Sequence, residues 1–397
     1  MLQQLISRSP DLKRLRDDGY DIEAQNGFLI MRDVPYVDNR KCVRRGILVS
    51  KLDLAGDVTT TPSTHVMNFA GDYPCDKDGR QLDKMKHQSS KKTLLPGLEV
   101  NHSFSSKPTN GKYKNFYEKM TTYAMLLSSH AQFLDPDVTA RTYPVVEVSE
   151  NESVFRYQDT ASSRAEICML TERLAQNRIA IVGLGGTGSY VLDLVAKTPV
   201  REIHLFDSDI FSQHNAFRAP GAPSLEQLRE KPSKVDFFEN QYSSMRRGIV
   251  AHNVLLSSTN VEQLQDMDFV FLCLDSGDSK REVLDGLDEF KIPFVDVGIG
   301  VQTGNNALLG ILRVTTSNVE NFELIKKENR IPLTEGVLDP AYSTNIQIAD
   351  LNSLAAALAV IKWKKTRGFY IDHEKEYHST YTIDGNTLAN ERLADET

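Results

Sequence analysis

Four glycines at 183, 185, 186 and 188 have the spacing of a turn that brings a backbone close to a phosphate. They stand in RIAIVGLGGTGSYVLDL, between an apolar run typical of a buried parallel strand and a run that favours a helix. The N–H groups and dipole at a helix N-terminus attract anions, and glycine leaves room for them. The spacing also fits a dinucleotide fingerprint, so an NAD enzyme stays open at this point.

Polar residues that follow the glycines extend this chemistry. Asp207 ends the next alternating strand, about 20 residues on, where a carboxylate can hold a ribose hydroxyl. Asn215 and Arg218 come just beyond it, Lys234 follows REKPS, and Asp275 ends the apolar run DFVFLCLD. A hydride-transfer site has no need of this second cluster. A triphosphate site does, because cations neutralise phosphates and a carboxylate can hold Mg²⁺.

Taken in order, the doubled glycine, the Asn-x-x-Arg spacing at 215–218, Lys234 and Asp275 resemble the adenylation core of the ubiquitin-activating-enzyme superfamily. This superfamily includes the sulfur-carrier adenylyltransferases of the ThiF, MoeB and HesA type. The resemblance covers roughly residues 151–370. It implies that ATP and Mg²⁺ activate the C-terminal carboxylate of a ubiquitin-like or sulfur-carrier protein, giving an acyl-adenylate and pyrophosphate.

The resemblance also implies a role for each residue. Gly183, Gly185, Gly186 and Gly188 would let the backbone approach the nucleotide, and Asp207 would hold its ribose. Charge neutralisation and positioning dominate such a phosphoryl-transfer reaction.

The phosphate-facing side chains would then be Arg218, Lys234 and Asn215. Arg218 would bind as a planar fork and Lys234 as a point charge, while Asn215 would add an uncharged hydrogen bond. A surface role for Lys234 stays open, because it stands among several other basic residues.

The resemblance also implies a ligand for Mg²⁺ and one additional arginine. Asp275 is preferred to Asp278 as the Mg²⁺ ligand because it comes first after the strand. The family often receives an additional arginine from before the core, sometimes from the other subunit. Arg164 and Arg156 are both candidates for that role.

The segment expected to cross over the nucleotide, residues 314–345, departs from the family pattern. It holds no cysteine to form a thioester and no Cys-x-x-Cys pair to bind zinc. The adenylate could pass directly to another protein such as a conjugating-enzyme-like acceptor, Thr334 could form an oxyester, or Cys75 could act from the N-terminal half. Ordinary structural roles remain the simpler interpretation of Thr334, and Cys75 is expected in an exposed polar loop.

These motifs predict an α/β fold: a Rossmann-like adenylation domain with a continuing β-sheet over 151–397, and an N-terminal α+β domain over 1–150. The N-terminal part has an Asn26-Gly27 hairpin signal, a turn-rich stretch at 59–79 expected to be a loop, and a helix around 115–131. It contributes no recognisable catalytic motif.

Further elements follow the nucleotide core. IPFVDVGIG and ALLGILRVT favour strands, and HSTYTIDGNTLANE favours a strand pair with a turn at its Asp-Gly. A helix is predicted over 345–368, with Leu351, Leu354, Leu358 and Ile361 on one face. That face could be core or a dimer interface.

Composition bounds the function. The 397 residues carry a formal charge of −8, which argues against nonspecific nucleic-acid binding. No run of 18 apolar residues is present, so we expect no membrane span. Four scattered cysteines suit a reducing cytosol, so we expect a cytoplasmic protein.

The leading hypothesis is therefore an ATP-dependent adenylyltransferase, a homodimer, acting in a bacterial ubiquitination-like conjugation pathway. An NAD(P)-dependent oxidoreductase is one alternative, although it leaves Asn215, Arg218 and Lys234 without a role. A catalytically silent scaffold of a conjugation complex is the other. It would be favoured if the phosphate-facing residues did not converge in space.

Overall fold

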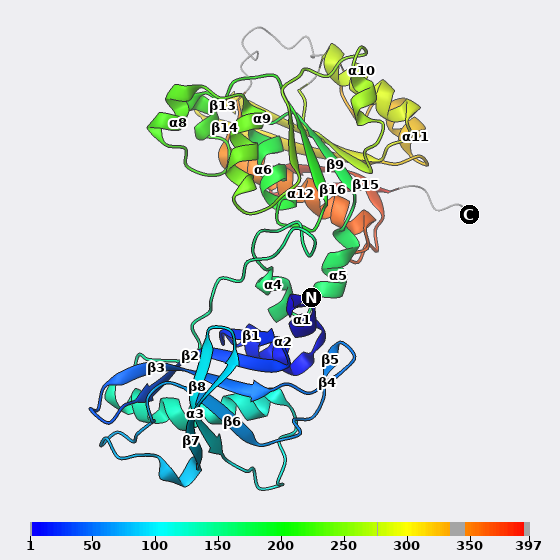
Figure 1. Cartoon of the computed structure of the whole chain (residues 1–397). Coiled ribbons are helices and arrows are strands. Elements are labelled where there is room, and N and C mark those ends of the chain that lie inside the picture. Colours follow the sequence, from blue (N-terminus) through cyan, green and yellow to red (C-terminus); the bar gives the residue numbers. More distant parts are fainter. Residues whose placement is uncertain (1, 276, 334–345, 393–397) are drawn as a thin grey trace. The chain divides into compact units, whose positions relative to one another are not determined.

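The chain divides into two structural units, Met1–Val146 and Glu147–Thr397. The computed structural model describes residues 2–275, 277–333 and 346–392. Figure 1 shows the helices and strands of both units.

The first unit is built on a six-stranded antiparallel sheet in the order β1-β2-β3-β6-β8-β7. Its strands are β1 Ile22–Gln25, β2 Phe28–Val37, β3 Val43–Lys51, β6 Val66–Ala70, β7 Lys86–Leu95 and β8 Leu98–Ser105, with a separate pair β4 Leu54–Ala55 and β5 Val58–Thr59. Its helices are α1 Leu2–Arg8, α2 Pro10–Asp17, α3 Phe116–Leu134 and the 3₁₀ turn η1 Asp83–Met85.

Helix α3 packs on β2 and β3 and buries the main core of this unit. Its N-cap is Asn115, whose side chain accepts a hydrogen bond from the Glu118 N–H at 2.9 Å. The hairpin predicted at Asn26-Gly27 is confirmed: Gln25 pairs with Phe28, and both turn residues have positive φ, 45° and 79°.

One prediction for this unit is wrong. The stretch 59–79, expected to be a loop, contains strand β6, whose Met67 and Phe69 are fully buried. The strand is only five residues long and lies among turn-forming residues, which hides its alternation in the sequence.

The second unit contains an eight-stranded mixed sheet in the order β11-β10-β9-β12-β13-β14-β15-β16. The first five strands are parallel and the last three antiparallel. The strands are β9 Arg178–Val182, β10 Glu202–Phe206, β11 Ile249–His252, β12 Phe269–Leu272, β13 Phe294–Gly304, β14 Ala307–Ser317, β15 Glu376–Thr382 and β16 Thr387–Arg392.

Helices cover both faces of this sheet. The helices are α4 Thr160–Arg164, α5 Cys168–Thr171, α6 Gly186–Val195, α7 Gln213–Ala216, α8 Leu225–Glu230, α9 Lys234–Ser243, α10 Asp278–Glu289, α11 Phe322–Lys327 and α12 Ala349–Thr366, with 3₁₀ turns η2 Glu172–Leu174 and η3 Val261–Leu264. This arrangement confirms the predicted α/β class with a continuing sheet.

Strand β9 shows how its residues alternate between the two faces. Ile179 and Ile181 belong to the core formed with α6, α9 and α12, whereas Ala180 and Val182 belong to the core formed with α10 and α11. Figure 1 shows α6 and α12 close together in this unit. The sequence run is therefore apolar throughout because both faces are covered.

Helix α12 lies where it was predicted, and the leucine face expected to be core or a dimer interface is only partly buried. Leu351 is buried, whereas Leu354 and Ile361 are 37% and 41% exposed. The buried face instead consists of small residues and one large aromatic: Ala355, Ala356, Ala359, Val360 and Trp363. Alanines allow α12 to approach α6 closely, so the helix turns this side inward.

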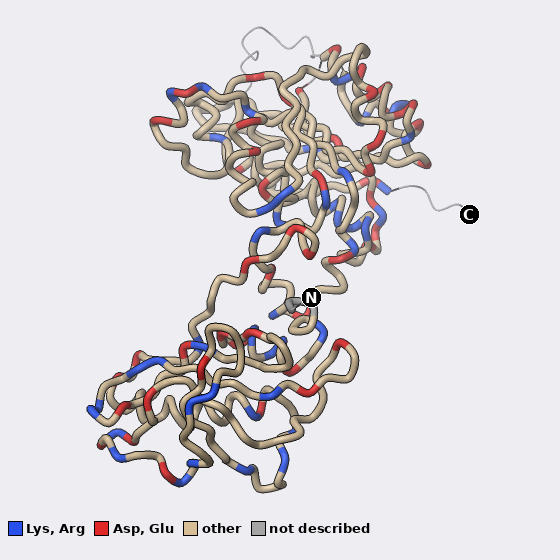
Figure 2. The backbone as a smooth tube through the Cα atoms, viewed as in Figure 1, with Lys and Arg blue, Asp and Glu red and all other residues tan. Residues whose placement is uncertain are grey.

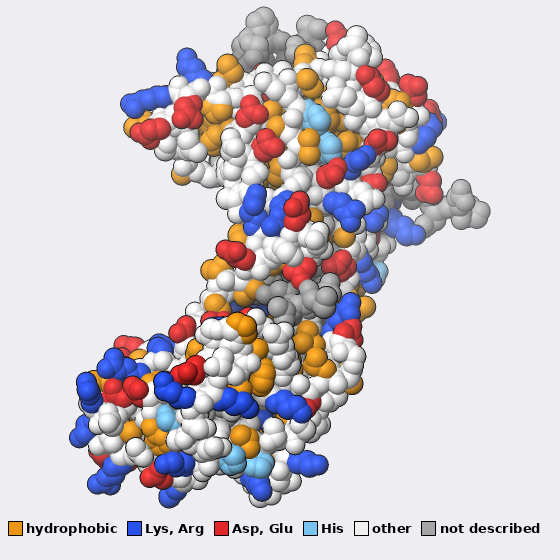
Figure 3. Space-filling view, in the orientation of Figure 1, with side chains coloured by type: hydrophobic (Ala, Val, Ile, Leu, Met, Phe, Trp, Pro, Cys, Tyr) orange, Lys and Arg blue, Asp and Glu red, His pale blue; other side chains and the backbone are white. Residues whose placement is uncertain are grey.

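Charge is divided unequally between the units. Residues 1–146 hold 21 Lys and Arg against 17 Asp and Glu, and residues 147–397 hold 25 against 37. Figures 2 and 3 show both signs spread over each unit, with hydrophobic side chains exposed between them. Within the described residues, none of the helices combines the length and apolarity needed to cross a membrane.

A lysine without exposed surface lies in the first unit. Lys119 of α3 donates from Nζ to Ser50 Oγ at 2.9 Å and to the Thr64 carbonyl at 2.8 Å. Burial lowers its pKa from 10.5 to about 8, a shift that Asp53 partly opposes. Below pH 8 the folded and unfolded chains both carry this proton, so folding pays the full cost of burying the charge.

We expect this cost to disappear as the pH rises from 8 to 10.5, because the folded chain then loses its proton first. The wild-type unfolding free energy should rise by about 3 kcal/mol relative to that of Lys119→Met over this range. Thermal unfolding of the full chain at several pH values measures the difference. The exposed Lys112→Met is the control, and a difference independent of pH would refute the assignment.

Candidate nucleotide site at the glycine-rich loop

The glycine-rich loop lies at the carboxyl ends of three adjacent parallel strands. It follows β9, and its neighbours in the sheet are β10 and β12. Ligands of open α/β sheets bind at this edge. Asp207 directly follows β10 and Asp275 comes shortly after β12, so the sheet brings both carboxylates to the edge where the loop stands.

Three of the four glycines are required by the packing of the chain itself. A Cβ on Gly188 would collide with the Gly183 carbonyl, and one on Gly186 would collide with the Asn352 side chain. Gly183 has φ of +89°, and a Cβ there would lie 2.7 Å from the Cys273 carbonyl. Gly185 is different: its nearest neighbour would be Gln347 Oε1 at 3.9 Å. Among these four glycines, Gly185 is therefore the one whose missing side chain is not explained by packing within the chain. Its role in making room for a nucleotide stays a prediction.

Asp207 ties the loop to the end of β10. Its Oδ2 accepts a hydrogen bond from the Leu184 N–H at 2.7 Å, and its Oδ1 accepts one from the Asp209 N–H at 2.8 Å. Lys234, the first residue of α9, is nearly buried and places Nζ 2.6 Å from Asp209 Oδ2 and 3.4 Å from Asp207 Oδ2. Lys234 therefore belongs to this edge of the sheet and is no surface lysine.

Asn215 and Arg218 are held at the same edge. The Asn215 side chain accepts from the Ser212 N–H at 2.8 Å and so caps the short helix α7. Asn352 Nδ2 donates to the Arg218 carbonyl at 3.3 Å, which joins this turn to α12. Within the described residues the buried Nε of Arg218 has no hydrogen-bond partner. An unsatisfied guanidinium N–H suits an anion.

Two residues that the sequence did not single out contact the loop. Asn352 of α12 accepts a hydrogen bond from Thr187 Oγ1 at 3.1 Å. Gln347, just before α12, accepts from the Gly186 N–H at 3.3 Å through its Oε1. Gly186 is the first residue of α6, so the Gln347 oxygen takes one of the N–H groups that an anion would use. Their separation of about 160 residues from the loop left no local signal.

The two candidate magnesium ligands lie in the loop after β12 and at the first position of α10. Asp275 is exposed in the connecting loop, and Asp278 opens α10, where it lies 3.6 Å from Arg281. Among the described residues, no group of three or more His, Cys, Asp and Glu side chains forms a metal-binding cluster. Asp275 as a ligand that acts together with nucleotide phosphates stays a prediction.

The two candidate arginines that precede the core, Arg156 and Arg164, have different surroundings. Arg156 is bound to the far end of α9: its side chain donates to the Ser243 carbonyl, and its N–H donates to Met245 at 2.9 Å. A ten-residue helix is about 15 Å long, so Lys234 lies well away at the other end of α9. Arg164 is exposed at the end of α4 and stays a prediction.

The two candidate acyl acceptors are Thr334 and Cys75. Thr334 lies outside the described residues. Cys75 was expected in an exposed loop, and this is wrong: it is buried, bridged to Val37 and Gln81. Burial and the neighbouring carboxylates, Asp76 foremost, raise the pKa of its thiol. An activated thiolate needs the opposite environment.

Cys273, just after β12, is partly buried and packs against the core beside the glycine loop. Burial raises the pKa of its thiol to about 12, so this cysteine stays protonated at neutral pH. It therefore acts as a packing residue.

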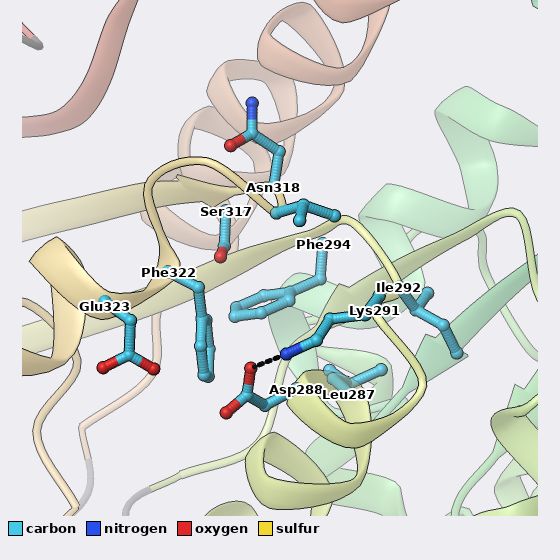
Figure 4. Close-up of a pocket in the computed structure, with 10 residues that line it drawn as sticks. Leu287, Asp288, Lys291, Ile292, Phe294, Ser317, Asn318, Phe322 and Glu323 are labelled. Carbon is cyan, nitrogen blue, oxygen red and sulfur yellow. Dashed lines mark hydrogen bonds and ion pairs between the residues drawn. The ribbon is translucent and has the colours of Figure 1, made fainter.

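The pocket in Figure 4 lies at a different edge of the sheet. Phe294 at the start of β13, Ser317 at the end of β14 and Phe322 at the start of α11 contribute to its lining. Asp288 and Lys291 form an ion pair of 3.0 Å at the same place. The glycine loop stands at the carboxyl ends of the parallel strands, so this pocket is no part of the candidate site.

Comparisons with known proteins give a match for each part of the chain. Residues 160–362 match the model of the ThiF family, and residues 10–160 match a model described as a domain of unknown function, DUF6791. Ubiquitin-like modifier-activating enzyme 5 of Aedes aegypti is 20% identical over 150 residues, and that of Drosophila virilis is 22% identical over 155. Each match covers 35% of this chain and 38% of the relative. The chain thus spans about two fifths of the length of these curated relatives.

Solved structures give weaker likenesses. The crystal structure of PaaA has a TM-score of 0.42 at 16% identity, covering 56% of this chain and 75% of that one. E. coli MccB with ATP has a TM-score of 0.42 at 16% identity, covering 59% and 69%. The sequence resemblance stated above is confirmed by the family model, which matches more than half of the 397 residues: the chain belongs to the ThiF family.

Proposed function

We propose that this protein adenylates the C-terminal carboxylate of a small ubiquitin-like or sulfur-carrier protein with ATP and Mg²⁺. Membership in the ThiF family supports ATP-dependent adenylation of a carboxylate as the general chemistry. The relatives named ubiquitin-like modifier-activating enzyme 5 suggest a protein as the substrate. A homodimer in the cytoplasm and a place in a bacterial conjugation pathway are part of the proposal.

The observation that carries the proposal is the contact of Asp207 with both the loop and Lys234. The Asp207 carboxylate accepts from the Leu184 N–H in the loop and lies 3.4 Å from Lys234 Nζ. This closeness supports the proposal that Asp207 binds the ribose and Lys234 the phosphates, because a single nucleotide would have to contact both. Arg218, with its unpartnered Nε, adds a second cation at this edge.

In this proposal the residues act by positioning and by charge. Asp207 holds the ribose, while Arg218 and Lys234 neutralise the phosphates as the carboxylate attacks the α-phosphorus and pyrophosphate leaves. Asn215 keeps the turn before Arg218 in shape through its cap. Mg²⁺ at Asp275 would screen the charge of the departing pyrophosphate.

We expect the full chain, with its carrier protein, to exchange labelled pyrophosphate into ATP, because formation of the acyl-adenylate is reversible. Asp275→Ala should reduce the exchange by about 100-fold or more without unfolding the chain, since the side chain is exposed. The exchange rate and a thermal unfolding curve measure both effects.

The control for this variant is Asp278→Ala, which changes an exposed carboxylate three positions away. It should exchange at the wild-type rate. Normal exchange in Asp275→Ala together with a loss in Asp278→Ala would move the metal ligand to Asp278. No exchange in the wild type with any carrier would reject the function.

A separate prediction concerns Gln347, which uses the Gly186 N–H when no nucleotide is bound. Gln347→Ala should lower the Kd for ATP by about threefold to tenfold, because one hydrogen bond no longer has to be displaced. Gln347→Glu should raise the Kd, because its carboxylate would repel the phosphates. Calorimetric titration with ATP measures both, and Gln302→Ala on the exposed part of β13 is the control. Weaker binding by Gln347→Ala would instead make Gln347 a direct ligand.

A further inference from the structure

Three charged side chains from separate elements meet inside the second unit, behind the candidate metal loop. Asp296 of β13 has no exposed surface and lies between Lys280 of α10 and Arg313 of β14. Lys280 Nζ is 2.6 Å from Asp296 Oδ1, and Arg313 Nη1 is 2.9 Å from Asp296 Oδ2. We call Lys280, Asp296 and Arg313 the buried triad.

A glycine leaves the space that one member of the triad occupies. Arg313 pairs across the sheet with Gly298, where a Cβ would collide with the guanidinium. Lys280 is only 2% exposed although it lies in the first turn of a helix. Lysine and aspartate are almost never this deeply buried unless they are paired.

Stability alone gives a poor account of the triad. A buried ion pair loses about as much hydration energy as it gains in attraction, and apolar residues of similar volume often serve as well. The three side chains together carry one net positive charge, and Arg313, at 17% exposure, is the member that reaches solvent. Because burying these charges costs hydration energy, we looked for a role of the network other than packing.

Each cation of the triad also holds one backbone carbonyl. Lys280 Nζ donates to the Leu274 carbonyl at 3.2 Å, directly before Asp275. Arg313 Nη1 donates to the Arg330 carbonyl at 2.6 Å, a few residues before position 334. The shared carboxylate of Asp296 therefore fixes two separate chain segments relative to each other. One carries the candidate metal ligand, and the other leads into the segment expected to cross the nucleotide.

We infer that Lys280, Asp296 and Arg313 are positioning residues. Through their shared pairing with the Asp296 carboxylate, the two cations hold the Asp275 loop and the chain before residue 334 in place. Lys280 is the member that positions Asp275 for Mg²⁺ and ATP, and Arg313 is the member that positions the segment at Arg330. This functional part rests on the proposed adenylation, whereas the two anchors rest on the triad alone.

The charge balance of the triad provides matched variants. Lys280→Met leaves Asp296 and Arg313 as a neutral pair and removes only the Leu274 anchor. Arg313→Met leaves Lys280 and Asp296 as a neutral pair and removes only the Arg330 anchor. Both avoid an unpaired buried carboxylate, which would be the costly change. Lys291→Met, which breaks the exposed pair with Asp288, is the control.

Amide hydrogen exchange of the full, ligand-free chain tests the two anchors without any assumption about activity. Lys280→Met should speed exchange about fivefold to tenfold in the peptide that contains Asp275, and leave the peptide at Arg330 unchanged. Arg313→Met should give the reverse pattern. Equal loosening of both peptides in both variants, or no change in either, would overturn the inference.

ATP binding at varied Mg²⁺ concentration tests the functional part. Lys280→Met should raise the Mg²⁺ concentration for half-maximal ATP binding about tenfold, because a small displacement of a ligand has large effects. Lys280→Arg should restore most of it, while the control Lys291→Met should match the wild type. If the wild type binds ATP and Lys280→Met has the same Mg²⁺ dependence, the positioning role is refuted. If the wild type binds no ATP, the proposed function fails, and hydrogen exchange alone decides the anchors.

Discussion

The close passage of the chain through residues 183–188 is the constraint on which the rest of the second unit depends. Side chains larger than hydrogen have no room at Gly183, Gly186 and Gly188, because the neighbours are the loop's own carbonyl, Cys273 and Asn352. This tight turn seats α6 on the sheet, next to α12. It also directs the Leu184 N–H toward Asp207, so the packing that needs glycine is the packing that assembles the candidate site.

Much of this site follows from local sequence patterns. The strand before the loop is a short, continuously apolar run, and the carboxylate after the next strand follows the glycines at a fixed spacing. Both signals are visible in a single sequence. The turn at Asn26-Gly27 is equally local, since its two positive φ values call for these residue types. The Asn-x-x-Arg spacing and Lys234 came from a family resemblance, which the family match supports.

Other features depend on contacts between distant segments, and no local pattern announces them. Gln347 and Asn352 read as ordinary polar residues beside a helix, yet they face the glycine loop. The leucine stripe of α12 is the more apolar side of the helix, but close approach to α6 favours its alanine side for burial. The buried triad joins α10, β13 and β14, so none of its members stands out alone in the sequence. Cys75 was expected to be exposed because its neighbours in the sequence are polar, yet contacts with distant residues bury it.

A site that serves adenylation should bind ATP and not a nicotinamide dinucleotide. Equilibrium titration of the full chain with ATP and with NADH, in buffer containing Mg²⁺, tests this most directly, and Asp207→Ala serves as the site control. We expect saturable ATP binding that is weakened in Asp207→Ala, with no comparable binding of NADH. Tight NADH binding in the absence of any affinity for ATP would contradict it.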